Sequence, residues 1–152
     1  MTLAISDLVR EVRARFVSGM ALLAPVVDLL ARVYVARVFL LSGGSKLSDW
    51  ESTLLLFTSE YHVPLLSPGL AAVLATSGEL LFGLLLALGL FTQSAAFGLF
   101  VINAVAVLSY YSELSESPAA IRDHMEWAII LATLMVGSSH PLSLDGIRNR
   151  LP

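Results

Sequence analysis

Six polar side chains in or beside apolar segments are the candidates for chemistry in this sequence. They are Arg37, Lys46, Glu79, Asn103, His124 and Glu126. Arg37 and Glu79 each interrupt a run of residues that is otherwise apolar enough for a lipid bilayer. An ionisable side chain at that depth is costly unless it is paired, and it is a candidate for handling protons or substrate.

Counting along the helices predicts that Arg37 and Glu79 form a buried pair. Arg37 precedes Lys46 by nine residues and Glu79 follows Gly69 by ten. At a rise of 1.5 Å per residue, both lie roughly 13–15 Å below the outer ends of their segments. Asn103 reaches the middle of its own segment by the same count. Two interpretations of the pair stay open: a structural ion pair that sets helix register, or a site that handles protons or substrate.

A second group, Lys46, His124 and Glu126, is expected at the outer mouth of the helices. His and Glu could move a proton at a quinone carbonyl, whereas a Lys46–Glu126 salt bridge between solvated residues is the simpler interpretation. Adjacent helix positions turn by about 100°, so His124 and Glu126 point some 200° apart. This geometry is poor for chelation, and no metal site is predicted.

The elements that position these side chains are expected to be helices in a membrane. The sequence is 57% hydrophobic and 14% charged, where a soluble domain has about a quarter charged residues, and its mean hydropathy is +0.81. The predicted fold is all-α: a four-helix transmembrane bundle (residues 22–152) after an amphipathic interfacial helix (residues 1–21). Spans are expected at about residues 26–45, 69–90 and 92–111, and from Trp127 to the HPLSLDG segment.

Basic residues predict the orientation of these spans. Those at the chain ends are Arg10, Arg13, Arg15, Arg148 and Arg150, whereas the loops expected on the other side hold Lys46 and Arg122. The positive-inside rule then places both termini in the cytoplasm of a bacterium, with the bundle in the inner membrane. Arg32 lies one helical turn after Asp28, and both are expected to snorkel to the cytoplasmic interface.

Composition excludes several classes of function. The sequence has no cysteine, so this chain carries no disulfide, thiolate metal site or thiol relay. Its net charge of −3 and the absence of a basic, aromatic-interleaved patch exclude nucleic acid as a partner. The SGGSK segment follows a membrane helix rather than a strand and lacks the spacing of a phosphate loop.

Three segments carry a family resemblance. They read ARVFLLSGGSKLSDW (residues 36–50), GELLFGLLLALGLFTQSAA (residues 78–96) and HPLSLDG (residues 140–146). The first two resemble the first and second spans of DoxX-like membrane proteins, and the third resembles their Ser-Leu-Asp ending, with Ser-His-Pro where Gly-Pro-Gly is usual. The positions that match the pattern are Arg37, Gly43, Lys46, Glu79 and Gly83.

The resemblance implies a four-helix membrane bundle and a link to redox chemistry. The family takes its name from relatives of the small subunit of a thiosulfate:quinone oxidoreductase, and other members are associated with redox or thiol-stress systems. The leading hypothesis is therefore a membrane subunit of a redox system that docks quinone between its helices. Arg37 and Glu79 would polarise or protonate a buried carbonyl, with Lys46, His124 and Glu126 at the entrance.

Two other classes of function stay open. One is a non-catalytic membrane scaffold, and the other is a small transporter or metal-handling accessory protein. The partners expected are the lipid bilayer and a soluble or membrane redox protein, and self-association into a homo-oligomer is left open. Any thiol chemistry would belong to a partner.

Overall fold

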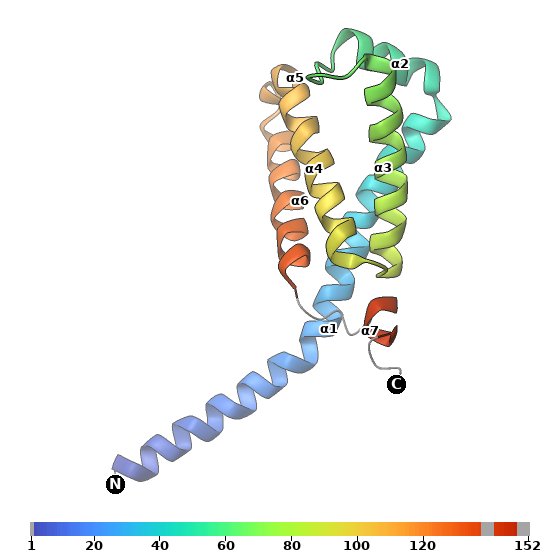
Figure 1. Ribbon diagram of the computed structural model, residues 1–152. Coiled ribbons are helices and arrows are strands. Elements are labelled where there is room, and N and C mark those ends of the chain that lie inside the picture. Colours follow the sequence, from blue (N-terminus) through green and yellow to red (C-terminus); the bar gives the residue numbers. More distant parts are fainter. Residues whose placement is uncertain (1, 138–141, 149–152) are drawn as a thin grey trace.

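The computed structural model describes residues 2–137 and 142–148, and in these residues the chain is helical without strands. The helices are α1 (Thr2–Ser48), α2 (Trp50–Ser59), α3 (Pro68–Leu88), α4 (Thr92–Ser109), α5 (Tyr111–Ser115), α6 (Pro118–Val136) and α7 (Leu144–Arg148). The all-α prediction is confirmed. The second half of α1 packs with α3, α4 and α6 into a bundle, and α2 and α5 lie at the end of the bundle opposite to α7 (Figure 1).

Local sequence signals explain where the helices begin and end. Asp49 caps α2 by accepting a hydrogen bond from the Ser52 backbone N–H at 3.1 Å. Pro68 starts α3 in the first turn, where the backbone N–H that proline lacks would have no partner within the helix. Gly89 ends α3 with a φ of 69°, in the left-handed region that glycine adopts without steric cost. The predicted break between the second and third spans therefore falls at Gly89.

The surface and interior of the bundle are arranged as a membrane protein requires. Large apolar side chains are exposed on its outside, among them Leu30, Leu41, Leu81, Leu84, Phe97, Leu108 and Ile129. Within the described part of the chain, three helices are long and apolar enough to cross a membrane, over residues Asp7–Ser48, Pro68–Leu88 and Thr92–Ser109. The fourth bundle helix, α6, begins at Pro118 rather than near Trp127, and its first turns carry charged residues.

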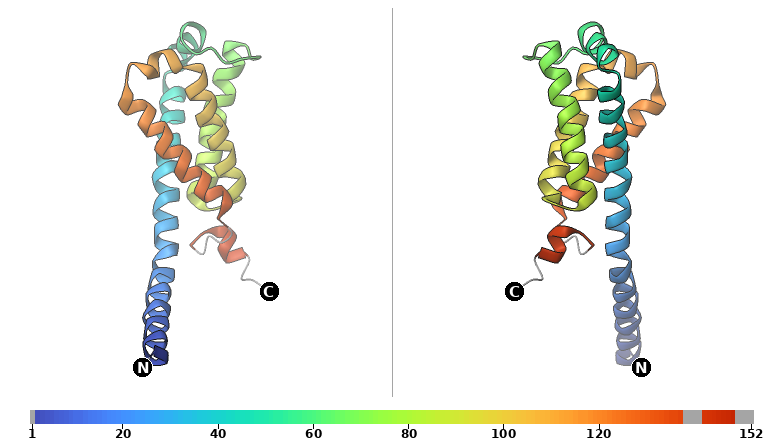
Figure 2. Two further views of the ribbon diagram at one scale, coloured as in Figure 1. Left: turned by 90° about the vertical axis from the view of Figure 1, so that its left-hand side faces the viewer. Right: turned by 90° about the vertical axis from the view of Figure 1, so that its right-hand side faces the viewer.

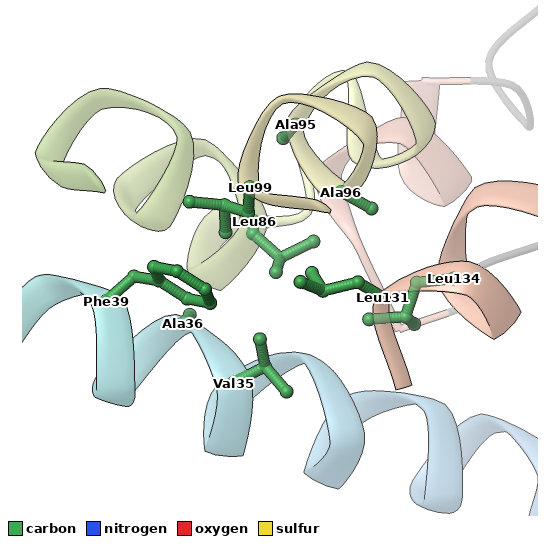
Figure 3. Packing of buried hydrophobic residues seen from close by; sticks show 9 residues of the cluster. All are labelled: Val35, Ala36, Phe39, Leu86, Ala95, Ala96, Leu99, Leu131 and Leu134. Carbon is green, nitrogen blue, oxygen red and sulfur yellow. The ribbon is translucent and has the colours of Figure 1, made fainter. Parts of the chain in front are cut away.

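The core joins all four bundle helices. It contains Val35, Ala36 and Phe39 from α1, Leu86 from α3, Ala95, Ala96 and Leu99 from α4, and Leu131 and Leu134 from α6 (Figure 3). The alanines on α4 let Leu86 and Leu131 meet at the centre of the bundle. This apolar layer fixes the rotation of α1, because Val35, Ala36 and Phe39 must all face inward.

The N-terminal segment continues directly into the first bundle helix, with Pro25 inside α1. The two views of Figure 2 show that it extends beyond the bundle at the end where α7 lies. Leu8, Val12, Phe16 and Met20 are exposed along it. That residues 1–21 lie on the membrane surface stays a prediction.

Candidate functional site

An ion pair lies inside the bundle between the end of α1 and the middle of α3. Lys46 Nζ is 2.8 and 2.9 Å from the two carboxylate oxygens of Glu79 and donates a further hydrogen bond to Ser42 Oγ at 2.6 Å. Ser42 and Lys46 are one helical turn apart, so they share the face of α1 that meets α3. The Glu79 side chain is 8% exposed and that of Lys46 is 20% exposed. The pair is therefore largely shielded by protein.

Glycines make room for this pair by letting the two helices approach closely. A Cβ on Gly43 would lie 3.1 Å from Glu79 Cβ, and one on Gly83 would lie 3.0 Å from Leu40 Cγ and 3.5 Å from the Ala36 carbonyl oxygen. Small residues at such crossings are typical of packed membrane helices. Gly43 on α1 and Gly83 on α3 therefore each allow the other helix to approach closely.

The predicted Arg37–Glu79 pair is wrong, because Glu79 binds Lys46 and Arg37 is exposed. The step of nine positions from Arg37 to Lys46 turns the helix by about 900°, which leaves the two side chains on opposite faces of α1. Both the rotation and the level were misjudged, because Glu79 is level with Gly43 and Lys46, whereas Ala36, next to Arg37, is level with Gly83. Lys46 is also not at the outer surface, since α2 packs against α1 and α3 beyond it.

A second polar contact joins α4 to α6. Asn103 Nδ2 donates to the His124 carbonyl oxygen at 3.0 Å, and Asn103 Oδ1 lies 2.8 Å from His124 Nδ1. Asn103 is buried and His124 is half-buried. Glu126 is exposed, so the predicted Lys46–Glu126 salt bridge is wrong. The sequence placed Asn103 and His124 in separate groups, and the structure brings them together.

Two cavities flank the Lys46–Glu79 pair. The first, of about 190 Å³, lies between α3 and α4 and is called the apolar cavity here. Three of its lining residues, Leu74, Val101 and Val105, are 50%, 42% and 37% exposed on the outside of the bundle. Because they belong both to the lining and to the outer surface, this cavity opens sideways between two membrane helices.

The second cavity, also of about 190 Å³, lies between α1, α4 and α6 and is called the polar cavity here. Its polar lining consists of Ser42, Lys46, Glu79, Asn103, His124 and Trp127, together with Tyr61 and Tyr110. The ion pair and Tyr61 line both cavities. One ligand could therefore have an apolar part and a polar part on the two sides of the pair.

A stack of aromatic rings covers the cavities at the end of the bundle formed by α2 and α5. The ring centroids of Phe57 and Tyr61 are 4.7 Å apart, and those of Tyr61 and Tyr110 are 4.6 Å apart. Tyr110 Oη donates to Glu60 Oε2 at 2.9 Å, and this hydrogen bond raises the pKa of Tyr110 to about 12. Sequence analysis did not select these three rings, because nothing local in the sequence indicates that Phe57, Tyr61 and Tyr110 stack.

Comparison with known proteins decides the family. A family model of DoxX proteins matches residues 27–112, more than half of the 152-residue chain. The chain belongs to the DoxX family. No curated protein and no solved structure matches it. The matched region includes Lys46, Glu79 and Asn103, whereas His124 and α7 of this DoxX protein lie beyond it.

A separate polar cluster closes the other end of the DoxX bundle. Arg32 is completely buried: its Nε lies 3.1 Å from Asp28, its Nη1 donates to the Leu86 carbonyl oxygen at 3.3 Å, and its Nη2 donates to that of Leu142. The predicted proximity of Asp28 and Arg32 is confirmed. The predicted snorkelling of Arg32 is wrong, because its guanidinium binds the end of α3 and the segment before α7 instead of water.

Asp145 holds α7 against the turn between α3 and α4. Its carboxylate accepts hydrogen bonds from the backbone N–H and the hydroxyl of Thr92 at 2.9 and 3.1 Å, and its own N–H donates to the Gly89 carbonyl oxygen at 2.9 Å. Asp145 thus acts as the N-terminal cap of α4 from outside that helix. This cluster and the one at Arg32 are structural, and neither lines the two cavities described above.

Metal binding has less support at this site than hydrogen bonding to an organic ligand. Among residues 2–137 and 142–148, no three His, Cys, Asp or Glu side chains are grouped so that they could hold a metal ion. The acidic and histidine side chains near the cavities are instead engaged by Lys46 and Asn103. The site therefore offers hydrogen bonds and one compensated charge pair to an organic ligand.

Proposed function

We propose that this DoxX-family protein is the membrane subunit of a redox system and holds a quinone beside the Lys46–Glu79 pair. The observation that carries the proposal is the position of this pair between an apolar cavity that opens sideways and a polar cavity inside the bundle. Quinones combine a hydrocarbon chain, which partitions into lipid, with a ring that needs hydrogen-bond partners. The two cavities supply these two environments side by side.

The cavity sizes suit a ring rather than a whole prenylated molecule. Each cavity has about 190 Å³, whereas small-molecule pockets usually have about 300–1,000 Å³. A single ring would occupy the polar cavity, and the hydrocarbon chain would leave through the apolar cavity into the bilayer. Leu74, Val101 and Val105, which line this exit, present only apolar atoms to the chain.

The residues of this chain would bind and orient the ring. The three N–H donors of Lys46 face Ser42 and the two oxygens of Glu79, so it can donate to a carbonyl oxygen by exchanging one of these bonds while Glu79 still compensates its charge. Quinone reduction or quinol oxidation needs two electrons, and a partner protein with a redox centre would exchange them. We place the protein in a bacterial inner membrane with both termini in the cytoplasm, because arginines are concentrated at its two ends.

The proposal is tested by quinone binding to the protein in lipid nanodiscs. Trp50→Phe leaves Trp127, which lines the polar cavity, as the single tryptophan, and a short-chain quinone in that cavity should quench its fluorescence. Lys46→Met should weaken binding about tenfold or more, since a hydrogen bond to a charged donor contributes about 1.5–3 kcal/mol. Ala106→Leu, which fills part of both cavities, should weaken it as well.

Arg37→Gln is the matched control, since it removes a positive charge from the same helix on the face away from the cavities. It should leave quenching unchanged. Equal quinone binding by the Lys46→Met and Arg37→Gln proteins would reject the proposed site. Absence of binding by a folded wild-type protein would favour the scaffold interpretation, in which the ion pair only fixes the crossing of α1 and α3.

A further inference from the structure

The hydrogen bonds between Asn103 and His124 determine which ring nitrogen of His124 carries a proton. The backbone carbonyl of His124 can only accept, so the side-chain group of Asn103 that faces it at 3.0 Å must be the NH₂ group. The amide oxygen of Asn103 is then the atom that lies 2.8 Å from His124 Nδ1. That oxygen can only accept, so Nδ1 of His124 carries a hydrogen.

This tautomer leaves a lone pair on Nε2 of the neutral imidazole. No described residue forms a hydrogen bond with Nε2 or an ion pair with the ring, and the ring packs edge-on against Trp127 at a centroid distance of 4.9 Å. His124 lines the polar cavity. A residue of the cavity lining therefore carries a hydrogen-bond acceptor that no described residue uses.

A second residue of the cavity lining, Trp127, carries a donor without a partner among the described residues. Trp127 Nε1 is buried and has no hydrogen bond in the described part of the chain. A buried N–H without a partner costs about 1–3 kcal/mol, so such a group calls for a ligand or a bound water. Two neighbouring residues of the cavity lining, His124 and Trp127, thus carry an unused acceptor and an unused donor.

We propose, as an inference that rests on the proposed function, that the polar cavity selects the reduced form of the ring over the oxidised quinone. The reduced form is a hydroquinone, which bears hydroxyl groups. A hydroxyl group both donates and accepts: its hydrogen matches His124 Nε2, and its oxygen matches an N–H of Trp127 or Lys46. A quinone carbonyl can only accept, so it leaves His124 Nε2 without a partner. In this arrangement Asn103 is a positioning residue, because it acts through the tautomer of His124.

Three matched probes test the selection in nanodiscs under anaerobic conditions: a short-chain quinone, its hydroquinone, and the dimethyl ether of that hydroquinone. The ether keeps the ring and the oxygen atoms but has no O–H to donate. Wild-type protein should bind the hydroquinone about tenfold more tightly than the ether, as one net hydrogen bond predicts. It should also bind the hydroquinone more tightly than the quinone.

Variants at positions 103 and 124 separate this role from a merely structural one. Asn103→Leu and His124→Phe should lower hydroquinone affinity to that of the ether and leave quinone affinity within about twofold. Asn103→Asp keeps an acceptor oxygen beside Nδ1 and should retain most of the preference. A loss of affinity for all three probes in Asn103→Leu would show that Asn103 only supports the fold.

The tautomer itself is measured by nitrogen-15 NMR of histidine-labelled protein, without any ligand. The signal that disappears in His124→Gln should show a protonated Nδ1 and an unprotonated Nε2, and Asn103→Leu should shift it toward the opposite tautomer. A protonated Nε2 in the wild type would overturn the inference. So would equal binding of hydroquinone and ether, even if quinone binding still depends on Lys46. If no probe binds, the proposed function fails, and the inference fails with it.

Discussion

Gly43 and Glu79 face each other where α1 crosses α3. A Cβ at position 43 would lie 3.1 Å from Glu79 Cβ and 2.9 Å from Leu80 Cγ, whereas a Cβ at the neighbouring Gly44 would meet nothing within 4 Å. The two glycines are adjacent in sequence but about 100° apart around the helix. Only the first of them permits the close approach that brings Lys46 to Glu79.

Gly43→Val should therefore separate α1 from α3, and Gly44→Val should not. We expect Gly43→Val to lower the free energy of unfolding by about 1–3 kcal/mol, the usual range for forcing extra atoms into a packed site. Gly44→Val should change it by less than about 0.5 kcal/mol. Thermal unfolding of the two variants in the same detergent measures the difference, and similar melting temperatures would contradict the crossing described here.

The Lys46–Glu79 pair should show strong coupling in a double-mutant cycle. Lys46→Met and Glu79→Met each leave one charge without its partner in a shielded site, which costs about 3–5 kcal/mol. The double variant should recover part of that loss. The Glu11–Arg15 pair, whose side chains are 61% and 80% exposed, is the control and should couple by less than 1 kcal/mol. Additive losses at positions 46 and 79 would refute the pairing.

The two arginines of the first bundle helix should differ sharply in their effect on stability. Arg32→Met removes three hydrogen-bonding contacts from a completely buried side chain and should cost about 3–5 kcal/mol. Arg37→Met changes an exposed side chain and should be nearly neutral. Folded yield and melting temperature in nanodiscs test this contrast. A larger loss for Arg37→Met would restore the pairing expected from the sequence.

Attachment of α7 should weaken in acid. Burial opposes ionisation of Asp145, but the hydrogen bonds from Thr92 and Phe91 and the charge of Arg148 outweigh it and hold the pKa below the usual 3.8. A carboxyl whose folded-state pKa is lowered stabilises the fold fully above its unfolded-state pKa, and this stabilisation is lost as pH falls below that value. Melting temperatures from pH 6 to pH 3 should therefore fall more steeply for wild type than for Asp145→Asn.

Asp7→Asn is the control for this measurement, since Asp7 is 68% exposed on the segment outside the bundle. It should follow the wild-type profile. Parallel profiles for wild type and Asp145→Asn would show that the Asp145 carboxylate does not anchor α7.

Reporter fusions should place the two ends of the chain on the same side of the membrane. The arginine distribution predicts a cytoplasmic position for both ends, and α7 lies at the same end of the bundle as the N-terminal half of α1 (Figure 2). A fusion at Pro152 should report the cytoplasm, and one near Glu116 the opposite side. If the fusion at Pro152 reports the outside, α6 does not cross the membrane.

The helices could be predicted from the sequence because apolar runs and their interruptions are local signals. Pro68, Gly89 and Thr92 mark the limits of α3 and α4 within a few residues of the expected ones. The beginning of α6 was missed by about nine residues, since its first turns are charged and do not resemble a membrane segment. Hydropathy detects apolar stretches, so it indicated only the part of α6 that follows these charged turns.

Partners across the bundle were harder to predict, because they depend on how each helix is rotated. Counting along the helices put Arg37 level with Glu79, but Val35, Ala36 and Phe39 turn Arg37 outward, and Lys46 faces Glu79. The apolar residues of α1 surround it so evenly that they define no clear inner face in the sequence. Asn103 and His124 were both selected as polar residues, but nothing local indicated that they meet.

The contacts of Arg32 set an order of events during synthesis of the protein. Asp28 precedes Arg32 by one turn, so this partner enters the membrane together with the arginine. The Leu86 carbonyl becomes available only after α3 is made, and the Leu142 carbonyl only after α6 has followed. Until then the guanidinium has Asp28 alone. The segment that follows α6 thus completes the burial of a charge that was made 110 residues earlier.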